Sequence, residues 1–461
     1  METIRIGKHE WQKSVGSEGQ DVYVANFLVD EDDVIGQYPS EELYDIVVEK
    51  DTDFYLPSQS FSDELTEDRV AFKFRKGTFT QFEQDGALEG LYGAASVSDN
   101  RGMAAGPKSE SHGNRLWVEM WQDQVLEWYA KGQPSNIDGS DPLQAILDKR
   151  DGYGIRASAW IRMTIEDKYE YETFFQEMMK ELAEMSIQEA SDHVKFIYEN
   201  YVSVTGYASQ IWSGIAGFYD RYPRIPFGRP TAYTENHLDK FEKCYPFARK
   251  LDKEFARLMP QRYGLQKKLA DDTDSKFLIG EDTTFTTITV NTTTNDRNAR
   301  MACHRDAGSL NEGFSNLTVI GDGKKSWKGG YLVCPEVRVA INVRPGDLLL
   351  VDNMRVIHGN TAIEAPDDGE LMRMSLVFYY RENMKKLGSW DYEALRRTYV
   401  KEREKNQEHP LWWSRWNGVS ANMWFEDEWY DYLRNHMGED TLKQYHPEAF
   451  EQAGSLEDFF S

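Results

Sequence analysis

The stretches TFTTITVN (284–291), SNLTVIGDG (315–323), GDLLLVDN (346–353) and RMSLVFYY (373–380) decide the fold of this chain. They are short runs rich in Val, Ile, Leu, Thr and Phe, set among Gly, Asn, Asp and Pro turn residues. Many short strands at such spacing are typical of a β-sandwich or barrel. The pattern therefore predicts a β-rich unit that begins near residue 276 and ends near residue 385.

The segments on either side of this unit have a different pattern of residue types. Residues 1–60 read as short strands and turns, and residues 85–113, rich in Gly, Ala and Ser, are predicted to form a long loop. Apolar residues at helical spacing predict helices over 115–131, most of 168–200 and about 239–259.

The chain after residue 386 also reads as helix. It carries a tryptophan cluster, for which packing is favoured over base stacking; the cluster comprises Trp412, Trp413, Trp416, Trp424 and Trp429. We therefore predict three parts: a mixed α/β region over 1–225, the β-rich unit over 226–385 and a helical segment over 386–461.

The 461 residues carry a formal charge of -25 that is unevenly spread. Residues 1–225 are strongly acidic, whereas residues 226–385 hold almost equal numbers of acidic and basic side chains. A solvated surface is the ordinary explanation of an acidic region, and a docking surface for a basic partner is the alternative. Global charge therefore gives no support to nucleic-acid binding.

Neither a membrane span nor an export signal is apparent in the composition. No apolar run approaches the roughly 20 residues that cross a bilayer, and the N-terminal METIRIGKHEWQKS has no apolar core. Three scattered cysteines are too few for a disulfide framework. We expect an intracellular protein, cytoplasmic or, in a eukaryote, nuclear.

The segment CHRD places His304 and Asp306 two residues apart. Residues i and i+2 of a strand point to the same face, so both side chains can reach one metal. VIHGN supplies a third candidate, His358, at the end of a later strand. Two imidazoles and one carboxylate form the facial triad of non-heme Fe(II) oxygenases, which leaves half of the coordination sphere open. Zinc can take the same ligands, but no HExxH motif accompanies them.

Arg373 lies 15 residues after His358, on what reads as a buried strand. Burying a guanidinium is costly unless an anion pairs with it. An internal Asp or Glu is one candidate, and the distal carboxylate of 2-oxoglutarate is the other. Ser375 shares the face of Arg373 and can add a hydroxyl donor, whereas zinc chemistry offers no reason for this arginine.

These residues resemble the TET/JBP group of dioxygenases. The resemblance rests on the strand 285–291, on His304-Arg305-Asp306, on His358-Gly359-Asn360 and on RMSLVFYY (373–380), and it covers about a third of the chain. It implies an α+β protein with a double-stranded β-helix (jelly-roll, cupin-like) core and helical or mixed flanks. It also implies Fe(II), 2-oxoglutarate and O2 as cofactor and cosubstrates, and DNA as substrate.

Matching positions imply the role of individual residues. His304, Asp306 and His358 would be the catalytic iron ligands. Arg373, Ser375 and Asn291 would hold 2-oxoglutarate. The substrate base would lie against Tyr379, Ser309 and Arg381.

The resemblance implies oxidation of the 5-methyl group of a pyrimidine in DNA, and two departures leave 5-methylcytosine and thymine both open. Arg381 stands where TET-like enzymes carry a base-reading His, and Ser309 stands where they carry a base-contacting Asn. Two rival functions also stay open: the same chemistry on a free amino acid or nucleoside, which the acidic balance favours, and a non-catalytic β-helix binding module.

Overall fold

The computed structural model of the chain describes residues 1–58, 64–98, 104, 106, 184–186, 188–189, 211–220, 227–366, 369–406, 408–409 and 426–451. The chain divides into two compact units. The first contains residues 1–113, 205–219 and 230–385, and the second contains 114–204, 220–229 and 386–461.

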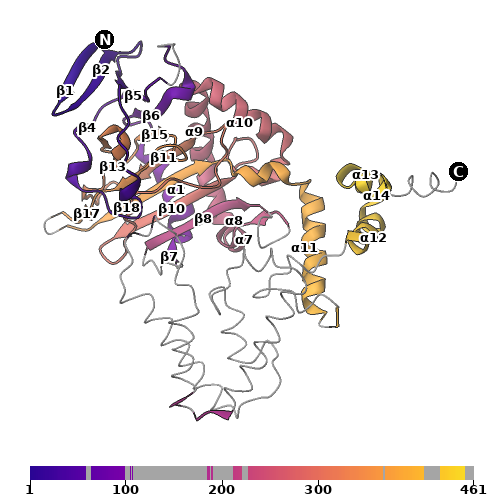
Figure 1. The fold of residues 1–461 in the computed structure, drawn as a ribbon. Helices are drawn as coiled ribbons and strands as arrows, with labels where there is room; N and C mark the ends of the chain where they lie inside the picture. The colour runs from indigo at the N-terminus through magenta and orange to yellow at the C-terminus, as the bar shows by residue number, and fades with distance from the viewer. Residues whose placement is uncertain are drawn as a thin grey trace. The chain divides into compact units, whose positions relative to one another are not determined.

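A 12-stranded sheet runs through the first unit (Figure 1). Along the main path of this sheet β3 and β5 pair in parallel, and all other neighbouring strands are antiparallel. Its strands follow the order β1 (Glu2–Ile6), β2 (His9–Val15), β3 (Asp21–Ala25), β5 (Thr52–Tyr55), β6 (Val70–Arg75), β15 (Leu348–Val351), β11 (Ser315–Ile320), β18 (Met372–Tyr379), β10 (Thr287–Thr294), β8 (Ile211–Tyr219) and β7 (Ser96–Ser98), with β9 (Arg229–Pro230) also pairing with β8.

A smaller sheet shares a hydrophobic core with the large one. Its four strands are β16 (Gly359–Asn360), β13 (Leu332–Cys334), β14 (Val339–Ile341) and β4 (Ile46–Val48), and a two-stranded ladder joins β12 (Lys328–Gly329) to β17 (Ile363–Glu364). Side chains of β6, β15 and β18 meet those of β13 and β14 in this core. The two-residue alternation of β18 assigns its faces, because Val377 and Tyr379 enter this core.

The opposite face of the large sheet is covered by helices (Figure 1). Met372, Met374, Leu376 and Phe378 of β18 pack there against helical side chains such as Phe247. The helices of the first unit are α1 (Gln81–Leu91), α7 (Ala232–Asn236), α8 (Leu238–Phe241), α9 (Tyr245–Leu258) and α10 (Pro260–Asp272). The helix predicted near 239–259 is therefore confirmed, as the run of α8, a 3-10 turn (Glu242–Cys244) and α9.

The prediction of a long loop over 85–113 is wrong for its first part, because α1 continues to Leu91 and β7 covers Ser96–Ser98. A capping box starts α1, in which the Thr80 side chain accepts from the backbone of Glu83 and the Glu83 carboxylate accepts from the backbone of Thr80. Gly90, which suggested a loop, is a packing residue, since a Cβ there would lie 2.9 Å from the carbonyl oxygen of Lys240.

The N-terminal strands continue the same large sheet, since β6 hydrogen-bonds to β15 with Phe72 opposite Val351. The three-part division of the chain stays a prediction, because its first boundary falls among residues 221–226, outside the described ranges. The helix predicted over 115–131 also lies outside those ranges, as does the one predicted over most of 168–200 except for residues 184–186 and 188–189.

The second unit is helical in its described C-terminal part, as predicted. Its helices are α11 (Trp390–Lys405), α12 (Glu426–Met437), α13 (Glu439–Tyr445) and α14 (Glu448–Glu451). Trp429 is fully buried against Tyr392 and Tyr399, so this tryptophan serves packing, whereas the other four of the cluster lie outside the described residues. Within the described part of the chain, no helix is both long and apolar enough to cross a bilayer.

Candidate metal centre

Three side chains that are distant in sequence meet at one point of the first unit. His304 and His358 form an isolated antiparallel bridge, in which the backbone N–H of each donates to the carbonyl of the other at 2.9 Å. The backbone N–H of Asp306 donates to the carbonyl of Asn353 at 2.8 Å, which brings the carboxylate beside the two rings. The ligand atoms of His304, Asp306 and His358 all lie within 4.8 Å of one another.

Backbone hydrogen bonds select the ring nitrogen that each histidine presents to this point. Nδ1 of His304 lies 2.8 Å from the carbonyl oxygen of Ala302, and Nδ1 of His358 lies 3.1 Å from that of Val356. An Nδ1–H that donates to a carbonyl leaves Nε2 with a free lone pair. The two Nε2 atoms lie 3.2 and 4.0 Å from Oδ1 of Asp306.

The charges at this point suit a cation. Burial opposes ionisation of Asp306, but the nearby His304 and His358 outweigh it and lower the pKa of the carboxyl to about 2. Burial also opposes ionisation of His304, but Asp306 outweighs it and raises the pKa of that ring. Burial and the neighbouring His304 lower the pKa of His358 to about 4, so its ring is neutral at pH 7. Asn353 Nδ2 donates to Asp306 Oδ2 at 3.0 Å and orients the carboxylate. A neutral imidazole and an ionised carboxylate are the forms that bind metals.

The predicted convergence is found, but the predicted strand is not. His304 takes part in an isolated bridge, and residues 305–307 belong to no strand. The bridge to His358 and the hydrogen bond from Asp306 to Asn353 bring the side chains of His304 and Asp306 together. The alternation of a regular strand is therefore not the cause of their proximity.

Arg373 lies in β18 and is 3% exposed. Its Nε has no hydrogen-bond partner, and no described carboxylate lies within 4.0 Å of its guanidinium. Burial and the nearby Arg344 lower the pKa of Arg373 to about 10. Burying a guanidinium without a counter-ion is costly, so binding of an anion would stabilise this group.

Ser375 and Asn291 lie on the same face as Arg373, on adjacent strands. Ser375 of β18 is paired with Asn291 of β10, and Asn291 Nδ2 donates to Ser375 Oγ at 3.4 Å. Ser213 of β8 donates through Oγ to Asn291 Oδ1 at 2.5 Å and so fixes which end of the amide faces Ser375. The sequence analysis missed Ser213, because nothing local to β8 indicates its pairing with β10.

The three predicted substrate residues also gather near the triad. Tyr379 is 9% exposed and faces the same interior as Arg373, as predicted. Burial raises the pKa of Tyr379, and the charges of Arg381 and Asp306 both act on its hydroxyl. Ser309 forms an isolated bridge with Arg381. The Arg381 guanidinium lies 4.4 Å from the ring centroid of Tyr219, a residue that the sequence analysis missed.

Residues 215–382 match the Tet_JBP family model, the oxygenase domain of the 2OGFeDO superfamily. This part of the chain is similar to the oxygenase domain of the TET/JBP group of 2-oxoglutarate- and Fe(II)-dependent dioxygenases.

Two curated relatives match the TET/JBP domain. "Thymine dioxygenase JBP1" of Leishmania braziliensis is 29% identical over 173 residues, which is 37% of this chain and 20% of the relative. "Bifunctional helicase and thymine dioxygenase JBP2" of Leishmania infantum is 32% identical over 174 residues, which is 37% of this chain and 15% of the relative. The matched part thus spans a fifth or less of each of these relatives.

A solved structure, "NgTET1 in complex with 5mC DNA", aligns over 83% of this chain and 90% of that chain, with 12% sequence identity and a TM-score of 0.36.

The described residues fit the metal and cosubstrate of the TET/JBP family. Two imidazoles and a carboxylate are the donor set of Fe(II) oxygenases, and Arg373 offers an unpaired guanidinium to the carboxylate of 2-oxoglutarate. The pairing of Arg373 with an internal acid, the alternative left open by the sequence, is not found among the described residues.

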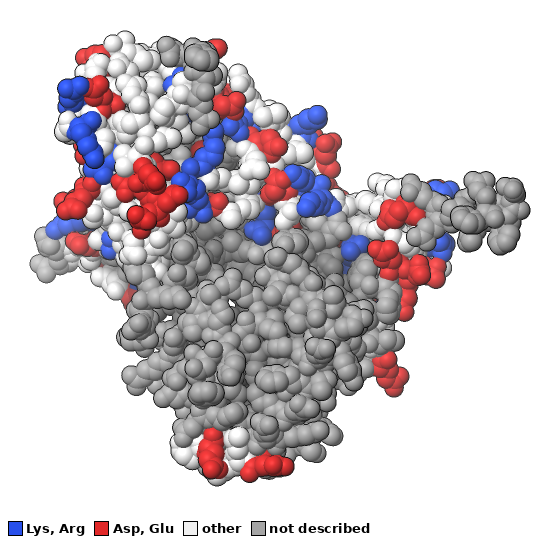
Figure 2. Space-filling model, viewed as in Figure 1, with Lys and Arg blue, Asp and Glu red and all other residues white. Residues whose placement is uncertain are grey.

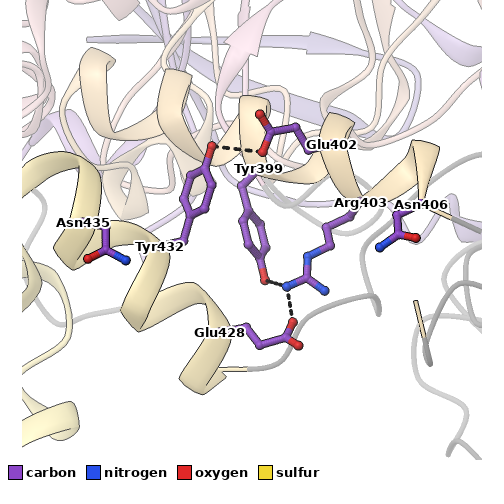
Figure 3. A pocket seen from close by; sticks show the side chains of 7 residues that line it. All are labelled: Tyr399, Glu402, Arg403, Asn406, Glu428, Tyr432 and Asn435. Atoms are coloured by element: carbon purple, nitrogen blue, oxygen red, sulfur yellow. Dashed lines mark hydrogen bonds and ion pairs between the residues drawn. The ribbon is translucent and has the colours of Figure 1, made fainter. Parts of the chain in front are cut away.

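A hollow in the helical second unit does not belong to the TET/JBP domain. It lies between α11 and α12, and Figure 3 shows its lining side chains, which are Tyr399, Glu402, Arg403, Asn406, Glu428, Tyr432 and Asn435. Arg403 is already engaged by the Tyr399 hydroxyl and the Glu428 carboxylate, and the hydroxyl of Tyr432 donates to Glu402. Its lining therefore offers no free cation for an acidic ligand.

Proposed function

We propose that the chain hydroxylates the 5-methyl group of a pyrimidine, 5-methylcytosine or thymine, in DNA. The observation that carries this proposal is the meeting of two imidazoles and a carboxylate within 4.8 Å, in the unit where Arg373 is buried without a counter-ion. The curated relatives named above are thymine dioxygenases, which supports a methylated pyrimidine as the substrate class.

We further propose that the two sheets form a double-stranded β-helix. Support comes from the core that strands of both sheets share and from the position of the site residues. Arg373, Ser375 and Tyr379 all project from one face of β18 toward that shared interior, where a jelly-roll encloses its ligands.

His304, Asp306 and His358 would hold Fe(II), and Arg373, Ser375 and Asn291 would hold 2-oxoglutarate. Bound together, the metal and cosubstrate supply the oxidising power that inserts an oxygen atom of O2 into a methyl C–H bond. The protein positions that methyl group, and the base must leave the helical stack to reach a buried centre.

Tyr379 would stack on the extruded base, and Arg381 with Ser309 would contact its polar edge. Arg381 carries donors only, so it selects acceptor atoms such as the carbonyl oxygens of a pyrimidine. Its contact with the ring of Tyr219, 4.4 Å from guanidinium to centroid, restricts the direction in which those donors point.

DNA would be bound through local basic side chains, since the net charge is strongly negative. On the face that Figure 2 shows, acidic and basic side chains are intermingled over the described part of the first unit. Lys324, Lys325 and Lys328, which lie close together in GDGKKSWKGG (321–330), are candidates, although Lys325 already pairs with Glu370 at 2.7 Å. A basic partner for the acidic N-terminal region stays a prediction.

Mass spectrometry of nucleosides tests the proposal. DNA containing thymine and 5-methylcytosine is incubated with the Fe(II)-loaded protein and 2-oxoglutarate, and is then digested to nucleosides. The expected result is a 5-hydroxymethyl nucleoside whose formation is lost in the His358→Ala variant. Consumption of 2-oxoglutarate that depends on His358 but leaves both bases unmodified would favour the free small-molecule substrate. No consumption of 2-oxoglutarate would favour the binding module.

A further inference from the structure

Two buried nitrogen donors near the guanidinium of Arg373 have no acceptor. One is Nε of Arg373 itself, and the other is the indole Nε1 of Trp327. Trp327 is 6% exposed, and its ring centroid lies 5.9 Å from Cζ of Arg373. A buried donor left without an acceptor destabilises the fold, and a buried indole N–H ordinarily finds a partner. Two such donors in contacting residues indicate a ligand that accepts from both.

The course of the chain explains how Trp327 reaches this place. In the large sheet β11 lies next to β18, with Ile320 paired with Met374. The chain that leaves β11 therefore passes the end of β18 where Arg373 lies. It returns through β12, which begins at Lys328, the residue after Trp327.

Arg344 holds the indole from a third segment. Its Nη1 donates to the carbonyl oxygen of Trp327 at 3.1 Å, and its Nη2 donates to that of Gly329 at 3.2 Å. Its Cζ also lies 5.3 Å from the centroid of the Trp327 ring, within cation–π range. The backbone and the ring of Trp327 are thus both fixed by one side chain.

The charge around the two free donors is positive. The Arg344 guanidinium is close enough to Arg373 to act on its charge, and no described carboxylate lies within 4.0 Å of either group. Asp347 and Glu49 act on the charge of Arg344 only from beyond ion-pair distance. Two guanidinium groups and an indole N–H, with no described carboxylate in ion-pair contact, match a carboxylate rather than a neutral acceptor.

We propose that Trp327 Nε1 donates, together with Arg373, to the distal carboxylate of the 2-oxo acid, and that Arg344 is a positioning residue for Trp327. This inference rests on the proposed function, because it concerns the cosubstrate of that site. It makes Trp327 a determinant of selectivity: the site favours 2-oxo diacids over 2-oxo monoacids of the same chain length.

Calorimetric titration of the oxygen-free, Mn(II)-loaded protein measures this selectivity without turnover. The ligands are 2-oxoglutarate and 2-oxopentanoate, which share the 2-oxo acid end but differ in the distal carboxylate. In Trp327→Phe, which keeps an apolar ring and loses the N–H, the Kd of 2-oxoglutarate should rise about tenfold or more. The Kd of 2-oxopentanoate should stay unchanged.

Trp11→Phe is the matched control. Trp11 is buried in the same core as Trp327, but its Nε1 already donates to the carbonyl oxygen of Val337 at 3.3 Å. Its replacement should leave both dissociation constants unchanged. An unchanged preference for the diacid in Trp327→Phe overturns the proposal and leaves Arg373 as the carboxylate donor.

A second variant keeps the test decisive if Trp327→Phe does not fold. Arg344→Lys retains the charge but cannot reach the carbonyls of Trp327 and Gly329 in the same two-pronged way. We expect it to reduce the preference for the diacid, and an unchanged preference would overturn the positioning role. A wild-type protein that binds both acids equally would instead refute the proposed cosubstrate site itself.

Discussion

At the scale of single residues, a buried charge with a partner and a buried charge without one have opposite effects on stability. Arg75 is 6% exposed and donates to Asp53 Oδ1 at 2.8 Å, so it completes an internal ion pair. Arg373 is buried to the same degree without any described carboxylate nearby. The first arginine serves the fold, and the second lowers stability until an anion binds.

Arg373→Met should therefore separate stability from cosubstrate affinity. We expect an unfolding free energy equal to or above that of the wild type, because the variant removes an uncompensated charge and keeps most of the volume. The KM for 2-oxoglutarate should rise at least tenfold, as a lost charge-assisted hydrogen bond contributes about 1.5–3 kcal/mol. Arg75→Met should instead lower the unfolding free energy. Urea unfolding measures the free energy, and initial rates measure the KM. An unchanged KM would mean that another basic residue binds the carboxylate of 2-oxoglutarate, and Arg381 would be the first to test.

Replacing any one of His304, Asp306 and His358 by alanine should abolish Fe(II)-dependent turnover without unfolding the protein. Each removes one of three ligand atoms that lie within 4.8 Å of one another. Arg305→Ala is the control, since Arg305 lies between two ligands in sequence but pairs with Asp32 and Glu336 at the surface. Metal content and circular dichroism accompany the rates, and a triad variant with near-wild-type turnover would show that its residue is not a ligand.

Tyr379 tests whether the substrate is a base. Tyr379→Leu keeps apolar volume in the shared core but loses the aromatic face, and base–aromatic stacking contributes about 1–3 kcal/mol. We expect a loss of DNA oxidation with little change in uncoupled 2-oxoglutarate consumption, and near-normal behaviour of Tyr379→Phe. If both activities of Tyr379→Leu fall together with its melting temperature, Tyr379 is a packing residue only.

At the scale of elements, one carboxylate ties β4 to the turn that precedes β14. Asp45, just before β4, accepts from Nε and Nη2 of Arg338 at 3.2 Å and lies 2.8 Å from Nδ1 of His9. Arg338 adopts a left-handed conformation with φ of 61° and accepts from the backbone of Asp45 at 2.8 Å. Burial opposes ionisation, but Arg338 and His9 outweigh it and lower the pKa of Asp45.

Asp45→Asn should thus destabilise the protein at neutral pH only. A carboxyl whose folded-state pKa is lowered stabilises the fold above its unfolded pKa of about 3.9, and this contribution is lost as the pH falls through the folded-state value. We expect a loss of about 0.5–1.5 kcal/mol at pH 7 that shrinks below about pH 4. Urea unfolding at pH 7 and below about pH 4 measures this loss. A loss of the same size at both pH values would mean that the amide disturbs packing instead.

At the scale of the whole molecule, the site depends on strands contributed by the first quarter of the chain. Phe72 of β6 is fully buried and shares a core with Val351 of β15 and Tyr379 of β18. Its ring stacks on Phe54 of β5, with 5.1 Å between centroids. The core beneath the candidate site is therefore built from strands of both the N-terminal and the later part of the described chain.

Phe72→Ala should lower the unfolding free energy by about 3–5 kcal/mol through the cavity it leaves. Phe82→Ala is the control, because Phe82 is 87% exposed and its removal should change the free energy by less than about 0.5 kcal/mol. Thermal and urea unfolding measure both. A small effect of Phe72→Ala would indicate that the N-terminal strands fold independently of the site.

Residue types and short-range alternation were sufficient to predict which side chains form the candidate site. Two histidines and an aspartate define a metal donor set wherever they meet, and the two-residue period of β18 alone placed Arg373, Ser375 and Tyr379 on one face. The buried strand, the helices after residue 386 and the helix near 239–259 followed from the same periodicities.

Only the tertiary structure decided which distant segments complete that site. The pairing of β8 with β10 brings Ser213 to Asn291, and the loop after β11 brings Trp327 to Arg373. From the sequence Gly90 is predicted to lie in a loop, but it lies in a helix and packs closely against the backbone of Lys240. The physical reason is common to all three cases: non-local contacts depend on strand order and packing distance, and neither leaves a period in the local sequence.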